Sequence, residues 1–186
     1  MATNLIKTTE GTPIVWANTT DYSNTLTGLS RTAQIDLTSI ATTAARQGAK
    51  VDLGATRAQR YIVYVGIEMD VAPASNTLVE FRFGESPHAT AGNANPGGMS
   101  GADAAYTGTA GDALEDSIHA LRFIGSLVMT ADAATVVQYG VVGILEDPMR
   151  YVMPLVINRT AQAFEGNATE MLVALIPLND DIQASA

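Results

Sequence analysis

The stretch RYIVYVGIEMDV, residues 60–71, has the clearest periodicity in the chain. Apolar side chains take every second position along it, and Ile62 and Tyr64 add apolar character on the opposite side. Alternation of this kind predicts a β-strand with one face in a core, and the extra pair predicts that its second face is also partly covered. The residues of the first set are Tyr61, Val63, Val65, Ile67 and Met69.

The next apolar stretch, TLVEFRF at residues 77–83, alternates in the same way. Val79, Phe81 and Phe83 fall on one face, while the other face carries charged side chains. Between the two stretches, residues 73–76 read PASN, a composition typical of a turn. The pattern predicts two antiparallel strands joined by a hairpin connection.

Short, β-branched stretches recur along the rest of the chain. Pro154 has no N–H to donate to a ladder, so we predict that its strand lies at a sheet edge. For residues 39–47, the abundance of alanine predicts a short helix as an alternative to a strand. The further strands are predicted at residues 121–129, 135–145, 150–158 and 169–178, with weaker candidates at 13–17, 29–37 and 46–53.

These stretches predict an all-β protein whose 186 residues form a single domain. No strand–helix alternation indicates a parallel sheet, so the expected architecture is an antiparallel β-sandwich or jelly roll. The absence of cysteine excludes disulfides, a thiolate nucleophile and cysteine-based zinc sites, and it favours folding inside a cell. Neither a signal peptide nor a bilayer-spanning apolar stretch is visible, so we expect a soluble protein.

Residues 84–117 are an unusual connection, rich in glycine and alanine, which carries acids but no lysine or arginine. A connection of this length inside a compact domain is either functional or disordered. We predict an ordered excursion, inserted as a long loop, that contacts a neighbouring subunit. A flexible loop is the alternative, because ordering this much glycine costs conformational entropy.

Charge is spread unevenly over the chain. The formal net charge is −9, with seven acids and seven bases in residues 1–83 but twelve acids and three bases in residues 84–186. Nucleic-acid binding needs clustered basic side chains, so we expect neither nucleic acid nor a membrane as a partner. The one basic cluster is predicted to provide docking charge for an acidic partner surface, with ordinary solvated charge as the alternative. Its members are Arg46, Lys50, Arg57 and Arg60.

No motif has the spacing of an active site. The nucleophile elbow and the P-loop ending are missing, and adjacent acids such as Glu146 and Asp147 are typical of solvated turns. We therefore expect no enzyme, no cofactor and no metal. Two weaker sets lack diagnostic ligand spacing: His119 with Glu115 and Asp116 for a transition metal, and Asp103, Asp112, Glu115 and Asp116 for calcium.

Two groups of short segments carry a resemblance to known proteins. They are DLTS (36–39), AARQGAK (44–50) and DLGATR (52–57), then SP (86–87), ATAG (89–92), NPGG (95–98) and SGAD (100–103). These segments resemble structural proteins encoded by tailed bacteriophages. The similarity covers most of residues 36–178 and includes no catalytic motif.

The resemblance implies a virion component. A small acidic β-sandwich among such proteins points to a capsid decoration, or cement, protein, made in the host cytoplasm and bound to the outer capsid surface. Its partners would be the major capsid protein and copies of itself, as a dimer or trimer. The alternative is a tail or head–tail connector protein, whose sequence has a similar composition of short segments. A third interpretation is a glycan-binding jelly-roll module, in which Trp16 and Tyr106 would stack on sugar rings.

Overall fold

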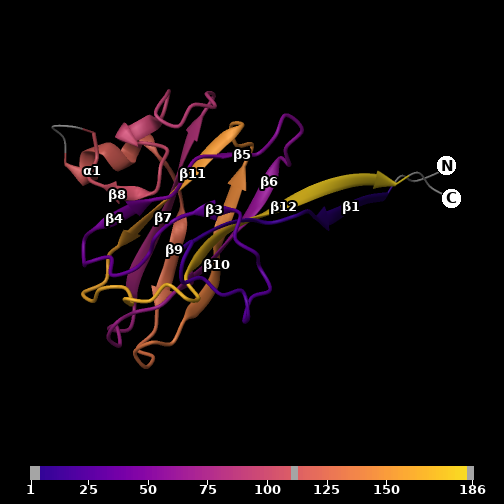
Figure 1. The fold of residues 1–186 in the computed structure, drawn as a ribbon. Helices are drawn as coiled ribbons and strands as arrows, with labels where there is room; N and C mark the ends of the chain where they lie inside the picture. Colours follow the sequence, from indigo (N-terminus) through magenta and orange to yellow (C-terminus); the bar gives the residue numbers. More distant parts are fainter. Residues whose placement is uncertain (1–4, 110–112, 184–186) are drawn as a thin grey trace.

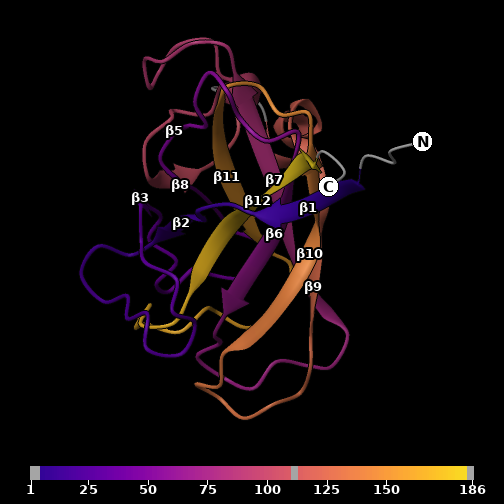
Figure 2. The same ribbon diagram turned by 90° about the vertical axis from the view of Figure 1, so that its right-hand side faces the viewer.

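The strands form two sheets that pack face to face, in a computed structural model that describes residues 5–109 and 113–183 (Figure 1, Figure 2). Sheet A runs in the order β10 (Gln138–Glu146), β6 (Arg60–Ile67), β12 (Leu172–Gln183), β2 (Ile14–Ala17) and β3 (Ala33–Gln34), and β1 (Leu5–Glu10) pairs with β12. Sheet B runs in the order β8 (Ala104–Tyr106), β4 (Ala45–Gln47), β11 (Tyr151–Asn158), β7 (Thr77–Ser86) and β9 (Arg122–Met129), and β5 (Val51–Asp52) pairs with β11.

Helices are few in the part of the chain that the structure describes: α1 (Leu114–Ser117) and the 3-10 turns η1 (Pro96–Gly98) and η2 (Ile118–Ala120). None of these has the length and hydropathy of a bilayer span. Every strand pair is antiparallel except β2 with β3. The predicted all-β sandwich is therefore confirmed.

A shared core lies between the sheets. The five alternating residues of β6 and its extension, from Tyr61 to Met69, are all buried, and Val79, Phe81 and Phe83 of β7 face them from the other sheet. Trp16 of β2 is fully buried and meets Phe83 edge-on, with ring centroids 5.9 Å apart and an interplanar angle of 70°. The periodicity of residues 60–71 and 77–83 thus identifies the buried side chains of both strands. The predicted hairpin between them is wrong, because β6 belongs to sheet A and β7 to sheet B.

The prediction that Pro154 marks an edge strand is wrong, because β11 lies in the middle of sheet B. On one side Pro154 is opposite Phe83 of β7. On its other side the neighbouring chain is interrupted between β4 and β5, and there Gly48 N–H donates to the Pro154 carbonyl at 2.9 Å. A residue's N–H and C=O point to the same side of a strand, so the missing N–H faces this interruption and no ladder bond is lost.

Several weaker predictions also change. Residues 39–47 do not form a helix: Thr43 has a positive φ of 63° and β4 begins at Ala45. The predicted strand 29–37 shortens to β3, and 46–53 divides into β4 and β5. In contrast, β12 extends beyond residue 178 to Gln183, because β1, which the sequence pattern did not predict, pairs with its far part.

The two edge strands β9 and β10 close one side of the sandwich. Each has an irregularity in its register, at Ile124 and at Val142, and both bulged side chains pack against the core. Gly125 and Gly143 let the backbones approach: a Cβ at Gly125 would lie 2.0 Å from the Val142 carbonyl oxygen, and one at Gly143 would lie 2.6 Å from that of Ile124. This closure, called the seam below, protects two edges that would otherwise be open to pairing with another chain.

A two-stranded ribbon projects from the sandwich. It consists of β1 and the far part of β12, in register from Leu5 opposite Gln183 to Glu10 opposite Leu178. Figure 1 shows this ribbon leaving the body on the side of sheet A. A lone two-stranded ribbon is only marginally stable in water, so the sandwich and any surface that it touches must hold it in place.

Candidate interaction surfaces

The predicted docking charge is divided between two places. Arg46 and Lys50 lie under the excursion, on the sheet B side. Arg46 Nε is 2.6 Å from the carboxylate of Asp103, and both side chains are largely buried. Lys50 Nζ lies within hydrogen-bond distance of four oxygens of the excursion, which share its three donors: Ser86 Oγ at 3.2 Å and the carbonyls of His88, Thr90 and Asn93 at 3.0, 2.9 and 3.1 Å. These two cations therefore organise their own chain.

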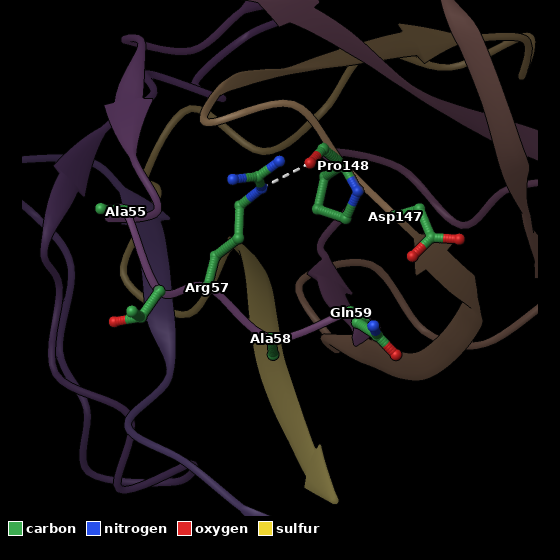
Figure 3. A pocket seen from close by; sticks show the side chains of 7 residues that line it. Ala55, Arg57, Ala58, Gln59, Asp147 and Pro148 are labelled. Carbon is green, nitrogen blue, oxygen red and sulfur yellow. Dashed lines mark hydrogen bonds between the residues drawn. The ribbon is translucent and has the colours of Figure 1, made fainter.

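Arg57 and Arg60 lie at the other place, where β6 begins and the ribbon departs. Figure 3 shows Arg57 in a pocket of about 260 Å³, with its Nε donating to the Pro148 carbonyl at 2.6 Å. Arg60 forms a half-exposed ion pair with Asp180 of β12 at 2.9 Å. The four residues thus do not gather into one patch, although Arg57 and Arg60 retain accessible guanidinium groups.

The excursion is ordered by its own chain. Met99, Tyr106, Ile118 and Leu121 form a second apolar cluster with β11 residues on the outer face of sheet B. Backbone and side-chain bonds add to it: β8 pairs with β4, and Ser100 N–H donates to Gln47 Oε1 at 2.7 Å. The described parts of the excursion, residues 84–109 and 113–117, therefore need no neighbouring subunit to hold them, and whether they contact one stays a prediction.

Replacing Lys50 with methionine should loosen the excursion selectively. The aliphatic stem is kept, but the carbonyls of His88, Thr90 and Asn93 lose a charged donor. We expect proteolytic cleavage within residues 84–109 to become about tenfold faster, because local opening controls cleavage when reclosing is rapid. Arg57→Met, which removes a cation outside the excursion, is the matched control. Equal cleavage rates for Lys50→Met and the native chain would contradict the role given to Lys50.

The weaker metal sets do not assemble. Glu115 pairs with Arg159 and Asp103 with Arg46, so these acids are engaged with cations. Asp112 lies outside the described residues. Across residues 5–109 and 113–183, no group of three or more histidine or acidic side chains has the geometry to hold a metal ion.

Three glutamates converge at the end of sheet A away from the ribbon. They line an open pocket of about 270 Å³, and within the described part of the chain no salt bridge reaches any of them. Glu68 is 8% exposed, and burial, together with the carboxylates of Glu170 and Glu165, raises its pKa. The pocket is lined by Glu68, Thr135, Glu165, Asn167, Thr169 and Glu170.

Glu68→Gln should stabilise the protein at neutral pH. A carboxyl whose pKa is higher in the folded state favours folding while it is protonated and loses that contribution as pH rises above its unfolded pKa. Because burial and two acids raise the pKa of Glu68, we expect the melting temperature of Glu68→Gln to exceed that of the native chain by a few degrees at pH 7.5. The difference should vanish near pH 4.

A thermal-melt series from pH 4 to 8 measures this effect. Glu146→Gln, which removes an exposed negative charge at the opposite end of sheet A, corrects for the general benefit of lowering the net charge of −9. A difference between the two variants that does not depend on pH would contradict this account of Glu68.

Sheet A leaves an apolar face uncovered. Ile144 of β10 is opposite Ile62 of β6, which is opposite Ile176 of β12; in the next row Val141 is opposite Tyr64. Val141 is 63% exposed and Ile144 47%, while the other three are half-buried. An antiparallel sheet that faces water normally carries polar side chains there. These five residues are called the sheet A face below.

The loop between β2 and β3 protects only the neighbouring part of this sheet. Its Tyr22 and Leu29 belong to a cluster that buries Val15 and Ala17 of β2 together with Leu172 and Ala174 of β12. Tyr139 lies over Gly66, and its ring stacks on Tyr64 with centroids 5.9 Å apart and an interplanar angle of 9°. The uncovered part therefore lies over β10, β6 and β12, toward the end where the ribbon leaves.

The sequence pattern gave a partial signal for the sheet A face. Ile62 and Tyr64 predicted that the second face of their strand is partly covered, and the structure shows cover only near Tyr64. Val141 and Ile144 could not be assigned to this face, because the bulge at Val142 changes the alternation along β10.

The two aromatic side chains considered for sugar stacking are both in the interior. Trp16 is fully buried in the core, and Tyr106 packs in the cluster under the excursion. Neither ring presents a face to a saccharide. No family model matches this chain, and neither a curated protein nor a solved structure matches it.

Proposed function

We propose that this chain is a non-enzymatic structural component of a tailed-bacteriophage virion and acts as a capsid decoration, or cement, protein on the outer shell. The observation that carries the proposal is the sheet A face, an exposed apolar surface on a fold whose other sheet is partly covered by the excursion. Exposed apolar patches on soluble proteins mark surfaces that bind other macromolecules. The resemblance of residues 36–57 and 86–103 to phage structural proteins gives the biological setting.

The proposed activity is free energy of association. Each copy contributes a modest interface with the major capsid protein or with another copy, and many such contacts on one shell become strong through avidity. Two features fit a protein that is added to a shell already assembled. The sheets share one core without disulfides, and the glycine-rich excursion is held by its own chain.

Imaging of intact particles tests the proposal. A cement protein should appear in many copies on the outside of the capsid, each contacting at least two shell subunits. Particles that lack the protein should assemble but rupture at a lower temperature, because the protein adds contacts to a lattice that others build. Density confined to the tail or the portal would contradict the cement assignment and support the tail or connector alternative. A protein absent from the particle would refute the virion role altogether.

A further inference from the structure

Backbone pairing builds the pocket of three glutamates, called the three-glutamate pocket below, at the end of sheet A away from the ribbon. Met69 is opposite Phe164 in an isolated antiparallel bridge, and both side chains are buried in the core. Glu165 N–H donates to the Glu68 carbonyl at 3.0 Å, which places Glu68 and Glu165 side by side next to that bridge. Because successive side chains of an extended strand point to opposite faces, these two carboxylates point away from the core. Like charges placed opposite each other in this way repel.

A loop formed by residues 165–170 brings the third carboxylate to the same place. The loop begins at the bridge and ends just before β12. A Cβ at Gly66 of β6 would lie 3.1 Å from the Glu170 carbonyl oxygen, so Glu170 lies beside the end of this strand. Asn167 Oδ1 accepts the Thr169 N–H at 3.1 Å and closes the loop on itself. Four of the six residues that line the pocket therefore come from this one loop.

Glu68 is a buried carboxylate without a partner. It is 8% exposed, it lines the pocket, and in the described part of the chain its carboxylate has neither a salt bridge nor a hydrogen bond. Buried ionised groups in native proteins are paired, because an unpaired charge loses its hydration without compensation. The neighbouring carboxylates of Glu170 and Glu165 increase that cost. A cation in the pocket would offset it.

The hydroxyl of Tyr139 is a second unsatisfied polar group next to these acids. Tyr139 Oη is buried and forms no hydrogen bond within residues 5–109 and 113–183. Burial, followed by the negative charge of Glu170, raises the pKa of Tyr139, so its hydroxyl stays protonated. A ligand with several N–H groups would supply a donor to the phenol oxygen while it pairs with the carboxylates.

The cations of the chain itself are engaged elsewhere. Lys50 bonds to the excursion and Arg57 to the Pro148 carbonyl, Arg31 lines a different pocket beside the loop between β2 and β3, and Lys7 belongs to the ribbon at the opposite end of sheet A. We therefore expect the positive charge for the three-glutamate pocket to come from another molecule. Six further arginines form salt bridges with other acids: Arg46, Arg60, Arg82, Arg122, Arg150 and Arg159.

The spacing of the carboxylates selects the kind of cation. No group of three acids or histidines in the described residues has the geometry to hold a metal ion. A guanidinium is planar, presents five N–H donors in a fork, and can bond to carboxylates that are too far apart to share one ion. It is also more weakly hydrated than an ammonium, so it loses less on entering a partly buried site. The pocket of about 270 Å³ is just below the usual range for small-molecule sites, about 300–1,000 Å³, and suits the end of a side chain.

We propose that the three-glutamate pocket binds the guanidinium group of an arginine side chain on a partner protein. The pocket is open, so the backbone of that arginine remains outside. This inference deepens the proposed function and rests on it for the partner, which would be a shell protein that presents an arginine. Its test does not need virus particles.

Titration of the full, isotope-labelled chain with N-acetyl-arginine amide tests the pocket. At about 20 mM salt, where exposed charges are weakly screened, amide NMR shifts should change in residues 165–170 and at Glu68, with a Kd of about 1 mM. N-acetyl-lysine amide should bind at least about fivefold more weakly, because an ammonium cannot form the same fork. N-acetyl-citrulline amide, which has a similar shape but no charge, should not bind.

Two variants test the carboxylates. Glu68→Gln and Glu170→Gln should each weaken binding of the capped arginine about tenfold, because each removes a charge-assisted acceptor. Glu146→Gln is the matched control: it changes the net charge equally but removes an exposed acid at the opposite end of sheet A, so its Kd should equal that of the native chain. Glu68→Gln is expected to melt above the native chain, so a loss of binding in this variant cannot be attributed to unfolding.

Four results would overturn the proposal. The capped arginine could cause no shifts up to about 20 mM, the capped lysine could bind as tightly, Ca²⁺ could displace the capped arginine at a lower concentration, or Glu146→Gln could weaken binding as much as Glu170→Gln. If free methylguanidinium binds and the capped arginine does not, the ligand is a small cation and the partner arginine is wrong. None of these results bears on the location of the protein in the particle, so imaging tests the proposed function separately.

Discussion

Gly125→Ala is expected to lower the free energy of unfolding by about 3 kcal/mol, the upper end of what overpacking usually costs. A Cβ at this position would lie 2.0 Å from the Val142 carbonyl oxygen, which is a backbone atom and cannot rotate away. The seam between β9 and β10 must therefore open, and Ile124 and Val142 would lose core contact. Thermal unfolding should show a melting temperature about 6–12 °C below that of the native chain.

Gly140→Ala is the matched control for the seam. It lies on β10, and its Cβ would meet only the end of the Leu127 side chain at 2.9 Å, which can adopt another rotamer. We expect a loss below about 1 kcal/mol. If Gly125→Ala and Gly140→Ala had the same melting temperature, the backbones of the seam could separate without a loss of stability.

Trp16→Ala is expected to cost about 3–5 kcal/mol of stability, as large-to-small changes of aromatic core residues do. The side chain is fully buried, packs edge-on against Phe83, and donates from Nε1 to the Ala49 carbonyl at 2.7 Å. Its removal leaves a cavity between the sheets and an unpaired carbonyl on the segment between β4 and β5. The midpoint of urea unfolding measures the loss of stability. Circular dichroism is the probe, because the variant removes the one tryptophan of the sequence.

Trp16→Phe separates the two contributions. It keeps most of the aromatic contact with Phe83 but removes the donor to Ala49, so we expect a loss intermediate between those of the native chain and Trp16→Ala. If Trp16→Phe were as unstable as Trp16→Ala, the hydrogen bond would dominate. If Trp16→Ala were as stable as the native chain, the core assigned to this side of the sandwich would be wrong.

The sequence predicted which side chains of β6 and β7 are buried, because alternation follows directly from the pleat of a strand. It did not predict that the two strands belong to different sheets. It failed where tertiary neighbours override local rules. Pro154 fits a central strand only because the adjacent chain breaks between β4 and β5 at that residue. Such a break has no signal in the local pattern of residues 150–158.

The surfaces were harder to predict than the core. A basic cluster in sequence does not specify which acids the fold brings near, and here Asp103, from the middle of the excursion, reaches Arg46. The sheet A face draws its residues from three strands far apart in the chain, β6, β10 and β12. Its apolar rows form only when the three strands pair in their observed register, and the bulge at Val142 changes which residues of β10 stand opposite β6. Periodicity within a single strand contains none of this information.

The place of β12 in sheet A has a consequence for how the chain folds. This strand pairs with β1, β2 and β6, so sheet A joins residue 5 to residue 183 and cannot close until residues 172–183 are in place. Contacts between residues so distant in sequence slow folding. The central strand of sheet B, β11, ends at Asn158, so every strand of sheet B precedes β12 in the sequence, and we expect native hydrogen-exchange protection to appear in sheet B before sheet A.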